Sequence, residues 1–233
     1  MFYQNIFKRH ELKYLITENQ KKKIIENTKE YMKLDEYGKT TIQNLYFDTD
    51  NYRLIRHSIE KPVYKEKLRI RSYKKLEKDN ELVFVEMKKK YNSIVYKRRI
   101  EMPYNKACKW LCKENKIDLD TQIEREIDYV INYYNNLKPH VYIAYERESY
   151  KGINEKDFRV TFDENVLWRE ENLSLKEDIY GKPIIDEGYV IMEIKTYEAI
   201  PLWLTHILTE EKIYKTSFSK YGHAYEDILN NID

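Results

Sequence analysis

The stretch KLRIRSY, residues 67–73, alternates positively charged and branched apolar side chains at every position from Lys67 to Arg71. Successive side chains on a β-strand point to opposite faces, so Lys67, Arg69 and Arg71 share one face, and Leu68 and Ile70 share the other. An amphipathic strand whose charged face meets water is the ordinary explanation for one such segment. The pattern therefore predicts a strand with one face in an apolar core. It leaves open what the three positively charged side chains contact.

Five further segments repeat this alternation with acidic residues at the parity of the basic ones. They are FKRHELKYLI (7–16), VFVEMKKK (83–90), YKRRIEM (96–102), FRVTFD (158–163) and GYVIMEIKTY (188–197). Across the set, at least ten Lys and Arg share the charged parity with four acids, Glu11, Glu86, Asp163 and Glu193. Six strands of this kind are hard to explain as six separate solvated faces.

Helical patterns between the strands offer a cover for the apolar faces. Residues 17–34 begin with a capping box formed by Thr17 and Gln20, and Thr121 with Glu124 repeats that signature inside the helical region 104–136. If helices cover the apolar faces from outside, the charged faces point towards one another. The sequence therefore predicts an α+β fold in which residues 1–233 form one domain, an eight-stranded antiparallel β-barrel with a polar, basic lumen and surrounding helices.

Composition limits the partners of such a domain. The formal net charge of the 233 residues is only +2, which argues against the long-range basic field of a general nucleic-acid-binding protein. No apolar run reaches the length of a membrane span, and the N-terminus lacks the apolar region of a signal peptide, so we expect a cytoplasmic protein. Cys108 and Cys112 have no Cys or His pair spaced to complete a zinc site, and we expect free thiols.

The excess positive charge of the predicted lumen calls for an anion of high charge density. Buried charge is costly unless it is paired, and four acids cannot pair ten cations. Phosphate chains suit this lining, because Arg presents a planar fork to phosphate oxygens and Lys a compact charge. The carboxylates then have a use, since Mg²⁺ or Mn²⁺ is held by one or two carboxylates together with substrate phosphate oxygens. The inward-facing carboxylates are therefore candidate ligands of such a metal.

The ordered motifs RHELKYLI, NLYFDTDNYRL, KLRIRSY, VFVEMKKK, VYKRR, YERESY, RVTFD, VIMEIK and SFSKYG cover nearly the whole chain. In this order they resemble the triphosphate tunnel metalloenzymes, and within them the VTC-type polyphosphate polymerase domain. The resemblance implies an eight-stranded tunnel that binds a nucleoside triphosphate or inorganic polyphosphate with a divalent metal. It assigns phosphate binding to Arg9, Lys13, Arg69, Arg71, Lys88, Lys97, Arg99, Arg147, Arg159, Lys195, Ser219 and Lys220, and the strand pattern adds Lys67. It assigns metal binding to Glu193, and Glu11 and Glu86 are the supporting candidates.

One position departs from the superfamily. Its opening motif is E-x-E-x-K, whereas this chain has Arg9, Glu11 and Lys13, so the first carboxylate is lost. A weaker metal site is less suited to two metals acting on a water nucleophile, and the departure fits the VTC-type branch better than the adenylate cyclase or thiamine triphosphatase branches.

Three functions follow from this resemblance and from the charge pattern. The first is a phosphotransferase that uses Mn²⁺ or Mg²⁺ and moves the γ-phosphate of ATP to a polyphosphate chain, with Lys88, Arg69, Arg71 and Glu86 at the reacting groups. The second is a tripolyphosphatase or nucleoside triphosphatase with water as acceptor, for which Glu11 or Glu86 would be the general base. The third is a binding module for polyphosphate or a nucleotide without turnover. We expect no nucleic-acid partner, and a monomer or weak dimer.

Overall fold

The computed structural model describes residues 10–92, 94–155, 157–197 and 199–230. Its strands are β1 (His10–Thr17), β2 (Met32–Asp48), β3 (Tyr64–Ser72), β4 (Leu82–Tyr91), β5 (Ile94–Pro103), β6 (Lys138–Gly152), β7 (Arg159–Arg169), β8 (Lys182–Pro183), β9 (Tyr189–Thr196) and β10 (Lys215–Thr216). Its helices are α1 (Glu18–Asn27), α2 (Arg53–Ile59), α3 (Tyr104–Leu111), α4 (Gln122–Tyr134), α5 (Leu202–Glu210) and α6 (Lys220–Asn230). The predicted mixture of antiparallel strands and helices is confirmed.

The strands form one antiparallel sheet in the order β10-β1-β9-β7-β6-β2-β3-β4-β5, with β8 paired to β7. The prediction of an eight-stranded closed barrel is wrong on two points: the described sheet has ten strands, and its two ends are not hydrogen-bonded to each other. The two additional strands, β8 and β10, contain two residues each, which is too short to show alternation in a sequence. Six of the other eight strands, β1, β3, β4, β5, β7 and β9, overlap the six segments predicted from their alternation.

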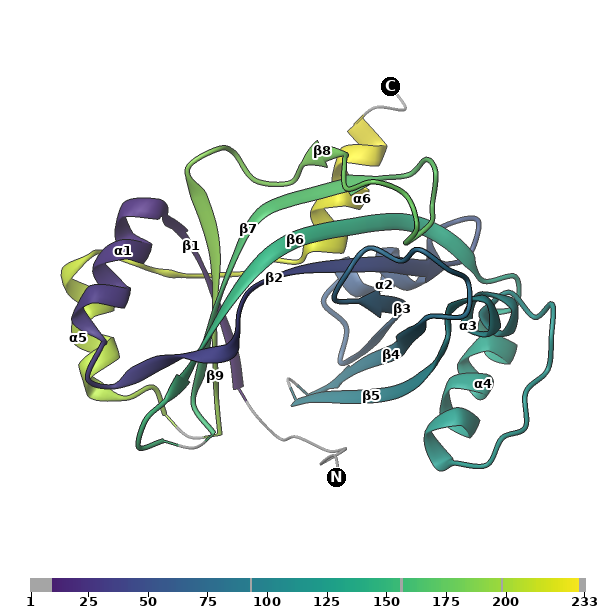
Figure 1. Ribbon diagram of the computed structural model, residues 1–233, viewed down its shortest axis with the longest axis horizontal. Helices are drawn as coiled ribbons and strands as arrows, with labels where there is room; N and C mark the ends of the chain where they lie inside the picture. Colours follow the sequence, from purple (N-terminus) through teal and green to yellow (C-terminus); the bar gives the residue numbers. More distant parts are fainter. Residues whose placement is uncertain (1–9, 93, 156, 198, 231–233) are drawn as a thin grey trace.

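The sheet is strongly curved (Figure 1). Side chains rather than backbone hydrogen bonds connect distant strands across its concave face. Lys88 of β4 and Glu11 of β1 lie near opposite ends of the strand order, yet the lysine Nζ is 2.7 Å from the Glu11 carboxylate. The concave face therefore forms a trough whose two sides meet through an ion pair.

The predicted helix starts agree with the structure better than the predicted ends. Thr17 with Gln20 and Thr121 with Glu124 form the expected capping boxes of α1 and α4. Helix α1 ends at Asn27 instead of residue 34, because Met32 already pairs with β6 at the start of the 17-residue strand β2. None of the described helices is long and apolar enough to cross a membrane. Both cysteines are free.

Two apolar cores cover the convex face of the sheet, one at each end of the molecule (Figure 1). Helices α3 and α4 contribute Trp110, Leu111 and Ile131 to one core against β3 and β4. Helices α1 and α5 contribute Ile24 and Leu204 to the other core, against β1, β7 and β9. Covering the apolar side of each strand in this way leaves the charged side on the concave face, as the alternation predicts.

The concave face is not polar along its whole length, which refines the predicted lumen. A third apolar cluster joins α6 and α2 to this face and includes Val141, Ile143 and Tyr145 of β6. These residues share the parity of Arg147, so β6 is apolar beneath α6 and charged beyond it. Tyr221 on α6 is 1% exposed and is anchored by a 2.9 Å hydrogen bond from its hydroxyl to the Asp48 carboxylate. Helix α6 thus fills one part of the trough and leaves the rest open as a cavity.

Candidate active site

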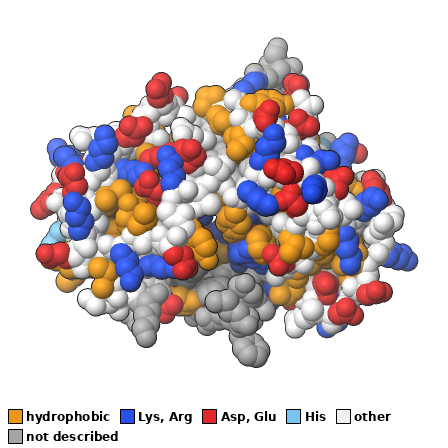
Figure 2. Space-filling view, in the orientation of Figure 1, with side chains coloured by type: hydrophobic (Ala, Val, Ile, Leu, Met, Phe, Trp, Pro, Cys, Tyr) orange, Lys and Arg blue, Asp and Glu red, His pale blue; other side chains and the backbone are white. Residues whose placement is uncertain are grey.

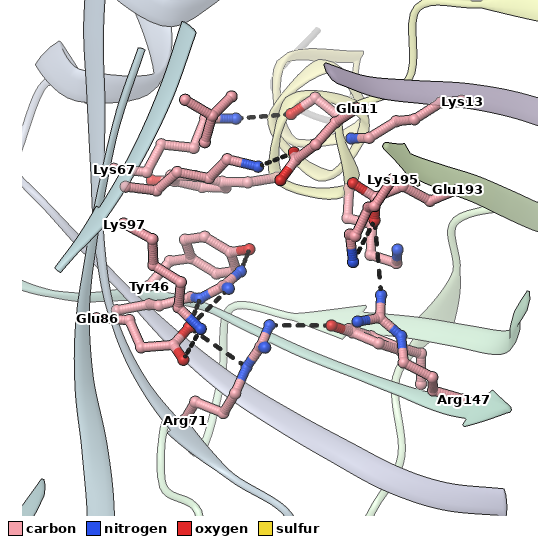
Figure 3. A pocket seen from close by; sticks show the side chains of 17 residues that line it. Glu11, Lys13, Tyr46, Lys67, Arg71, Glu86, Lys97, Arg147, Glu193 and Lys195 are labelled. Carbon is pink, nitrogen blue, oxygen red and sulfur yellow. Dashed lines mark hydrogen bonds and ion pairs between the residues drawn. The ribbon is translucent and has the colours of Figure 1, made fainter. Parts of the chain in front are cut away.

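The open part of the trough contains a cavity of about 160 Å³, which we call the inner chamber (Figure 3). It is lined by Glu11, Lys13, Tyr46, Lys67, Arg69, Arg71, Glu86, Lys88, Val95, Lys97, Tyr145, Arg147, Glu193, Lys195, Ser219, Lys220 and Tyr221. Nine of these residues are Lys or Arg, and three are Glu. The structure therefore brings together, around one small cavity, thirteen of the residues that the sequence predicts for the site.

Strand register places like charges side by side in the inner chamber. Lys67 on β3 lies directly opposite Lys88 on β4, and Lys88 lies directly opposite Lys97 on β5. Like charges in directly opposed cross-strand positions are destabilising. A row of three lysines across three adjacent strands is therefore costly to the folded protein unless an anion compensates it.

Glu86 is the counter-ion of the next row along the same strands. Its side chain is 1% exposed, and its carboxylate is 2.8 Å from Arg69 Nη2, 2.6 Å from Lys97 Nζ and 3.6 Å from Arg71 Nε. Burial alone would raise the pKa of Glu86, but Arg71, Arg69 and Lys97 outweigh it and hold the pKa well below its usual range. Glu86 is thus a fixed negative charge that orders three cations around the chamber.

The other two carboxylates lie on the opposite side of the chamber, on β1 and β9. Glu11 faces Lys195 across the ladder and Lys13 faces Glu193, so the two acids are diagonal neighbours on the concave face. Glu11 pairs with Lys88 at 2.7 Å, and Glu193 with Lys195 at 3.5 Å. Burial opposes ionisation of both acids, yet the neighbouring lysines keep their pKa values lowered. Both are therefore carboxylates at neutral pH.

Several lysines of the inner chamber are poorly compensated. Burial lowers the pKa of Lys13 to about 8 against the attraction of Glu193, and it lowers the pKa of Lys97 to about 7 against that of Glu86. Burial lowers the pKa of Lys67 well below its ordinary value, and the neighbouring cations lower it further. Its Nζ donates to the neutral Ser219 Oγ at 2.7 Å, so this contact supplies no opposite charge. A polyanion in the chamber would favour the protonated form of all three.

Three tyrosines and Val95 also line the chamber, and none of the four was predicted for the site. Tyr46 Oη accepts a 2.8 Å hydrogen bond from Arg69, and its ring stacks on Tyr221 with centroids 4.7 Å apart. Tyr145 Oη accepts from Arg71 at 3.0 Å; although burial raises the pKa of Tyr145, Arg71 and Arg147 outweigh this and lower it to about 8. The only sequence signal for Tyr145 is its parity with Arg147, which is equally the parity of apolar core residues.

Asp163, placed on the inward face by the sequence without an assigned role, lies behind the chamber wall. Its carboxylate is fully buried and accepts from Arg147 at 2.5 and 2.7 Å and from Lys220 at 2.5 Å. Burial raises the pKa of Asp163, but these two cations lower it well below the usual range. The residue therefore orients a β6 arginine and the first residue of α6 towards the cavity.

Three predicted phosphate-binding residues do not line the inner chamber. Arg99 stacks its guanidinium on Phe84, 3.3 Å from the ring centroid. Arg159 lies 3.8 Å from Asp35 in a side-chain ion pair, and its own side chain is 41% exposed. Arg9 falls outside the described residues. Roles for these three stay predictions.

The chemistry of the donors fits a hard divalent cation only in part. The described residues contain no group of three or more His, Cys, Asp or Glu that could hold a metal by themselves. Glu11 and Glu193 are ionised and adjacent, which matches a Mg²⁺ or Mn²⁺ site completed by substrate phosphate oxygens and water. Both oxygens of Glu86 already face cations, so Glu86 is a poorer ligand than the predicted metal site assumed.

The face of the molecule in Figure 2 shows acidic and basic side chains interspersed. This mixture agrees with the net charge of only +2 for the whole chain, whereas the lining of the inner chamber has nine Lys or Arg against three Glu. A curved antiparallel sheet whose concave face is a cation-lined trough is the architecture expected of the triphosphate tunnel class.

Comparison with known proteins assigns the family. The family model of the VTC domain matches residues 8–229, so the chain belongs to the VTC domain family. Among solved structures, a candidate adenylate cyclase from Bacillus halodurans is 15% identical with a TM-score of 0.56, and the match covers 91% of this chain and 96% of that one. A candidate adenylyl cyclase from Hippeastrum with a dominant triphosphatase activity is also 15% identical, with a TM-score of 0.53 and coverage of 92% and 93%. At this identity the two structures establish a shared fold. A search of curated proteins gave no match.

Proposed function

We propose that the protein transfers the γ-phosphate of ATP to an inorganic polyphosphate chain bound in the inner chamber. The observation that carries this proposal is the charge of the cavity, where nine Lys and Arg surround three carboxylates. Each of the three carboxylates already lies beside at least one of these cations. Unbalanced charge at this density in a buried site is the electrostatic complement of a phosphate chain.

The chamber supplies positioning and charge neutralisation, which are most of what phosphoryl transfer requires. Arg71 on β3 and Arg147 on β6 present guanidinium groups from two sides of the cavity (Figure 3), and Arg69 on β3 lines the same cavity. The three guanidinium groups suit the non-bridging oxygens of a transferring phosphoryl group. Lys88 and Lys97 add point charges on the β4–β5 side. Glu86 keeps Arg69 and Lys97 in place between turnovers.

The step itself balances without a proton donor or an oxidant. A terminal oxygen of the polyphosphate chain attacks the γ-phosphorus of ATP, and the bond between that phosphorus and the β,γ-bridging oxygen breaks. ADP leaves with the electron pair, and the chain becomes one unit longer. A Mg²⁺ or Mn²⁺ ion held by Glu11 and Glu193 would neutralise charge on the phosphate oxygens.

Hydrolysis in the same chamber is the second candidate, because a triphosphatase activity is known for the Hippeastrum protein of the same fold. Water must lose a proton when it attacks, which requires a general base near the γ-phosphorus. The lowered pKa values of Glu11, Glu86 and Glu193 make these paired carboxylates weak bases. A phosphate acceptor is already an anion at neutral pH, so the arrangement favours transfer over hydrolysis.

The test is incubation with ATP and Mn²⁺ or Mg²⁺, while orthophosphate release and acid-insoluble polyphosphate are both followed. Polyphosphate formed by the wild-type protein and lost in Glu193→Gln would support the transferase. Glu187→Gln removes an equal charge from an exposed loop position and serves as the matched control. Orthophosphate without polymer would establish the hydrolase, and binding without either product would establish a binding module.

A further inference from the structure

Asp48, at the end of β2, is a fully buried carboxylate that does not line the inner chamber. Its Oδ1 accepts from the backbone N–H groups of Thr49 at 2.8 Å and of Leu54 at 2.9 Å. Its Oδ2 accepts from the backbone N–H of Ile55 at 3.0 Å and from the Tyr221 hydroxyl at 2.9 Å. A carboxylate offers about four acceptor positions, so all those of Asp48 are in use.

Side chains that precede α2 cap its first turn. Tyr52, the N-cap residue, is in the left-handed region with a φ of 55° and makes no side-chain capping bond. Thr49 Oγ accepts from the N–H of Arg53 at 3.0 Å, and Asp48 accepts from the next two amides. The hydrogen bond from Tyr221 on α6 is therefore additional to the capping of α2, and it joins the two helices through one carboxylate.

The first turn of α6 carries groups of the proposed phosphate site. Ser219, Lys220 and Tyr221 are consecutive, and all three line the inner chamber. Ser219 Oγ accepts from the N–H of Gly222 at 3.0 Å, which fixes where this turn begins. The position of the turn therefore decides where the Lys220 amine meets a ligand.

Two side-chain hydrogen bonds that hold this turn use groups for which a phosphate chain would compete. Lys67 Nζ donates to Ser219 Oγ at 2.7 Å, and Lys220 Nζ donates to the Asp163 carboxylate at 2.5 Å. Phosphate oxygens accept strong hydrogen bonds from both amines. A bound phosphate chain therefore weakens both of these bonds.

The hydrogen bond from Tyr221 to Asp48 does not involve such a group. Burial raises the pKa of Tyr221 well above its usual range, and Asp48 raises it further, so the hydroxyl keeps its proton. Tyr221 also packs with Ile55 of α2 in one apolar cluster, which holds the two helices in contact. This bond is the anchor of the turn that persists when a ligand engages the lysines.

We propose that Asp48 is a positioning residue of the inner chamber, which holds Lys220 at the phosphate site by tying the first turn of α6 to the start of α2. This inference rests on the proposed function, because it takes Lys220 as one of the cations that bind the phosphate chain. Asp48 itself touches no ligand. Asn in its place would keep one of the two acceptor oxygens and turn an NH₂ group towards two donors.

The test is a double-mutant cycle between Asp48→Asn and Lys220→Met. Tripolyphosphate dissociation constants are measured by calorimetry well below the melting temperature of each variant. Lys220→Met removes the charge and keeps an apolar stem over the Tyr145 ring, whose centroid lies 4.4 Å from the lysine Nζ. Asp50→Asn is the matched control, since it removes the same charge from an exposed side chain that pairs with Lys138.

We expect Asp48→Asn to weaken tripolyphosphate binding about tenfold, the lower end of what metal sites lose when the partner that orients a ligating side chain is removed. In the Lys220→Met background the same substitution should cost less than about twofold, because the amine that Asp48 positions is gone. The control should stay within about twofold of wild type, as exposed ion pairs contribute little.

Unchanged affinity in Asp48→Asn, or an equal loss with and without the Lys220 amine, would mean that Asp48 only stabilises the fold, and either result would overturn the proposal. If Asp48→Asn does not fold, Tyr221→Phe replaces it in the cycle, since it removes the bond to α6 and leaves α2 capped. A loss of about threefold that disappears in the Lys220→Met background is then expected, and its absence is equally decisive. Failure of the wild-type protein to bind tripolyphosphate would refute the proposed function and this inference with it, whereas the other outcomes refute the inference alone.

Discussion

Replacing Glu86 with Gln tests whether the inner chamber contains more positive charge than its own carboxylates neutralise. The substitution keeps the shape of the side chain and removes the one buried charge that Arg69 and Lys97 share, at 2.8 and 2.6 Å. Breaking a buried ion pair from one side costs about 3–5 kcal/mol, because the remaining charge stays buried. For a domain of this size, about 2–4 °C is lost per kcal/mol, so we expect the melting temperature to fall by about 6–20 °C.

Ligand addition makes the same experiment specific for anion binding. A ligand at 100 times its dissociation constant stabilises the protein by about 2.7 kcal/mol. Because tripolyphosphate supplies negative charge where Gln does not, its stabilising effect should be larger in Glu86→Gln than in the wild-type protein. Glu146→Gln is the control, since its ion pair with Lys39 at 2.8 Å is half-exposed and contributes at most about 1 kcal/mol. A Glu86→Gln protein that melts within about 2 °C of wild type would refute the electrostatic reasoning.

Three further outcomes follow from the site. First, the folded pKa values of Lys13 and Tyr145, both about 8, lie below their unfolded values of 10.5 and 10.0, so the unfolded chain holds more protons between pH 8 and 10. The free energy of unfolding of the ligand-free protein should therefore rise with pH over that window, by up to about 1.4 kcal/mol per pH unit for each group. Denaturant titrations at pH 7 and pH 9.5 measure this rise, and equal free energies of unfolding at the two pH values would contradict the prediction. Second, Glu193→Gln should lower metal-dependent turnover at least about 100-fold without weakening metal-free tripolyphosphate binding, and loss of both would indicate a structural role. Third, Tyr221→Phe should cost about 1 kcal/mol in chemical denaturation by removing the hydrogen bond to Asp48, and a neutral result would mean that this bond does not anchor α6.

The alternation of residues predicted most of the sheet because each long strand has one face in an apolar core. The parity of Arg69, Arg71 and Lys88 was enough to place them on a common face, and the structure gathers them around one cavity. Parity could not reveal whether the barrel closes, since closure depends on hydrogen bonds between strands distant in sequence. The strands β8 and β10 were too short to carry any period.

The tyrosines of the site were not predicted from the sequence, and one physical reason explains all three. Tyr46, Tyr145 and Tyr221 are largely buried, and their rings pack in the apolar cluster that joins α6 to the concave face. The same three residues also line the chamber. A tyrosine with an apolar body and a polar tip fits a core and a binding site equally well, so its type and spacing do not distinguish the two. Only the position of α6, which fills part of the trough, decides which tyrosines contact the cavity.

The position of α6 also explains why so much charge can remain unpaired in a folded protein. The β10–α6 segment supplies neutral partners to two of the lysines, Ser219 Oγ to Lys67 and the Phe218 carbonyl to Lys13. These contacts satisfy hydrogen bonds without neutralising charge, so the chamber keeps its attraction for an anion while its amines are not left without acceptors. A carboxylate in place of Ser219 would stabilise the ligand-free fold and oppose phosphate binding. Ser219→Asp should therefore raise the melting temperature and weaken tripolyphosphate binding. A variant with a higher melting temperature and tighter tripolyphosphate binding would show that the uncompensated positive charge is not what attracts the anion.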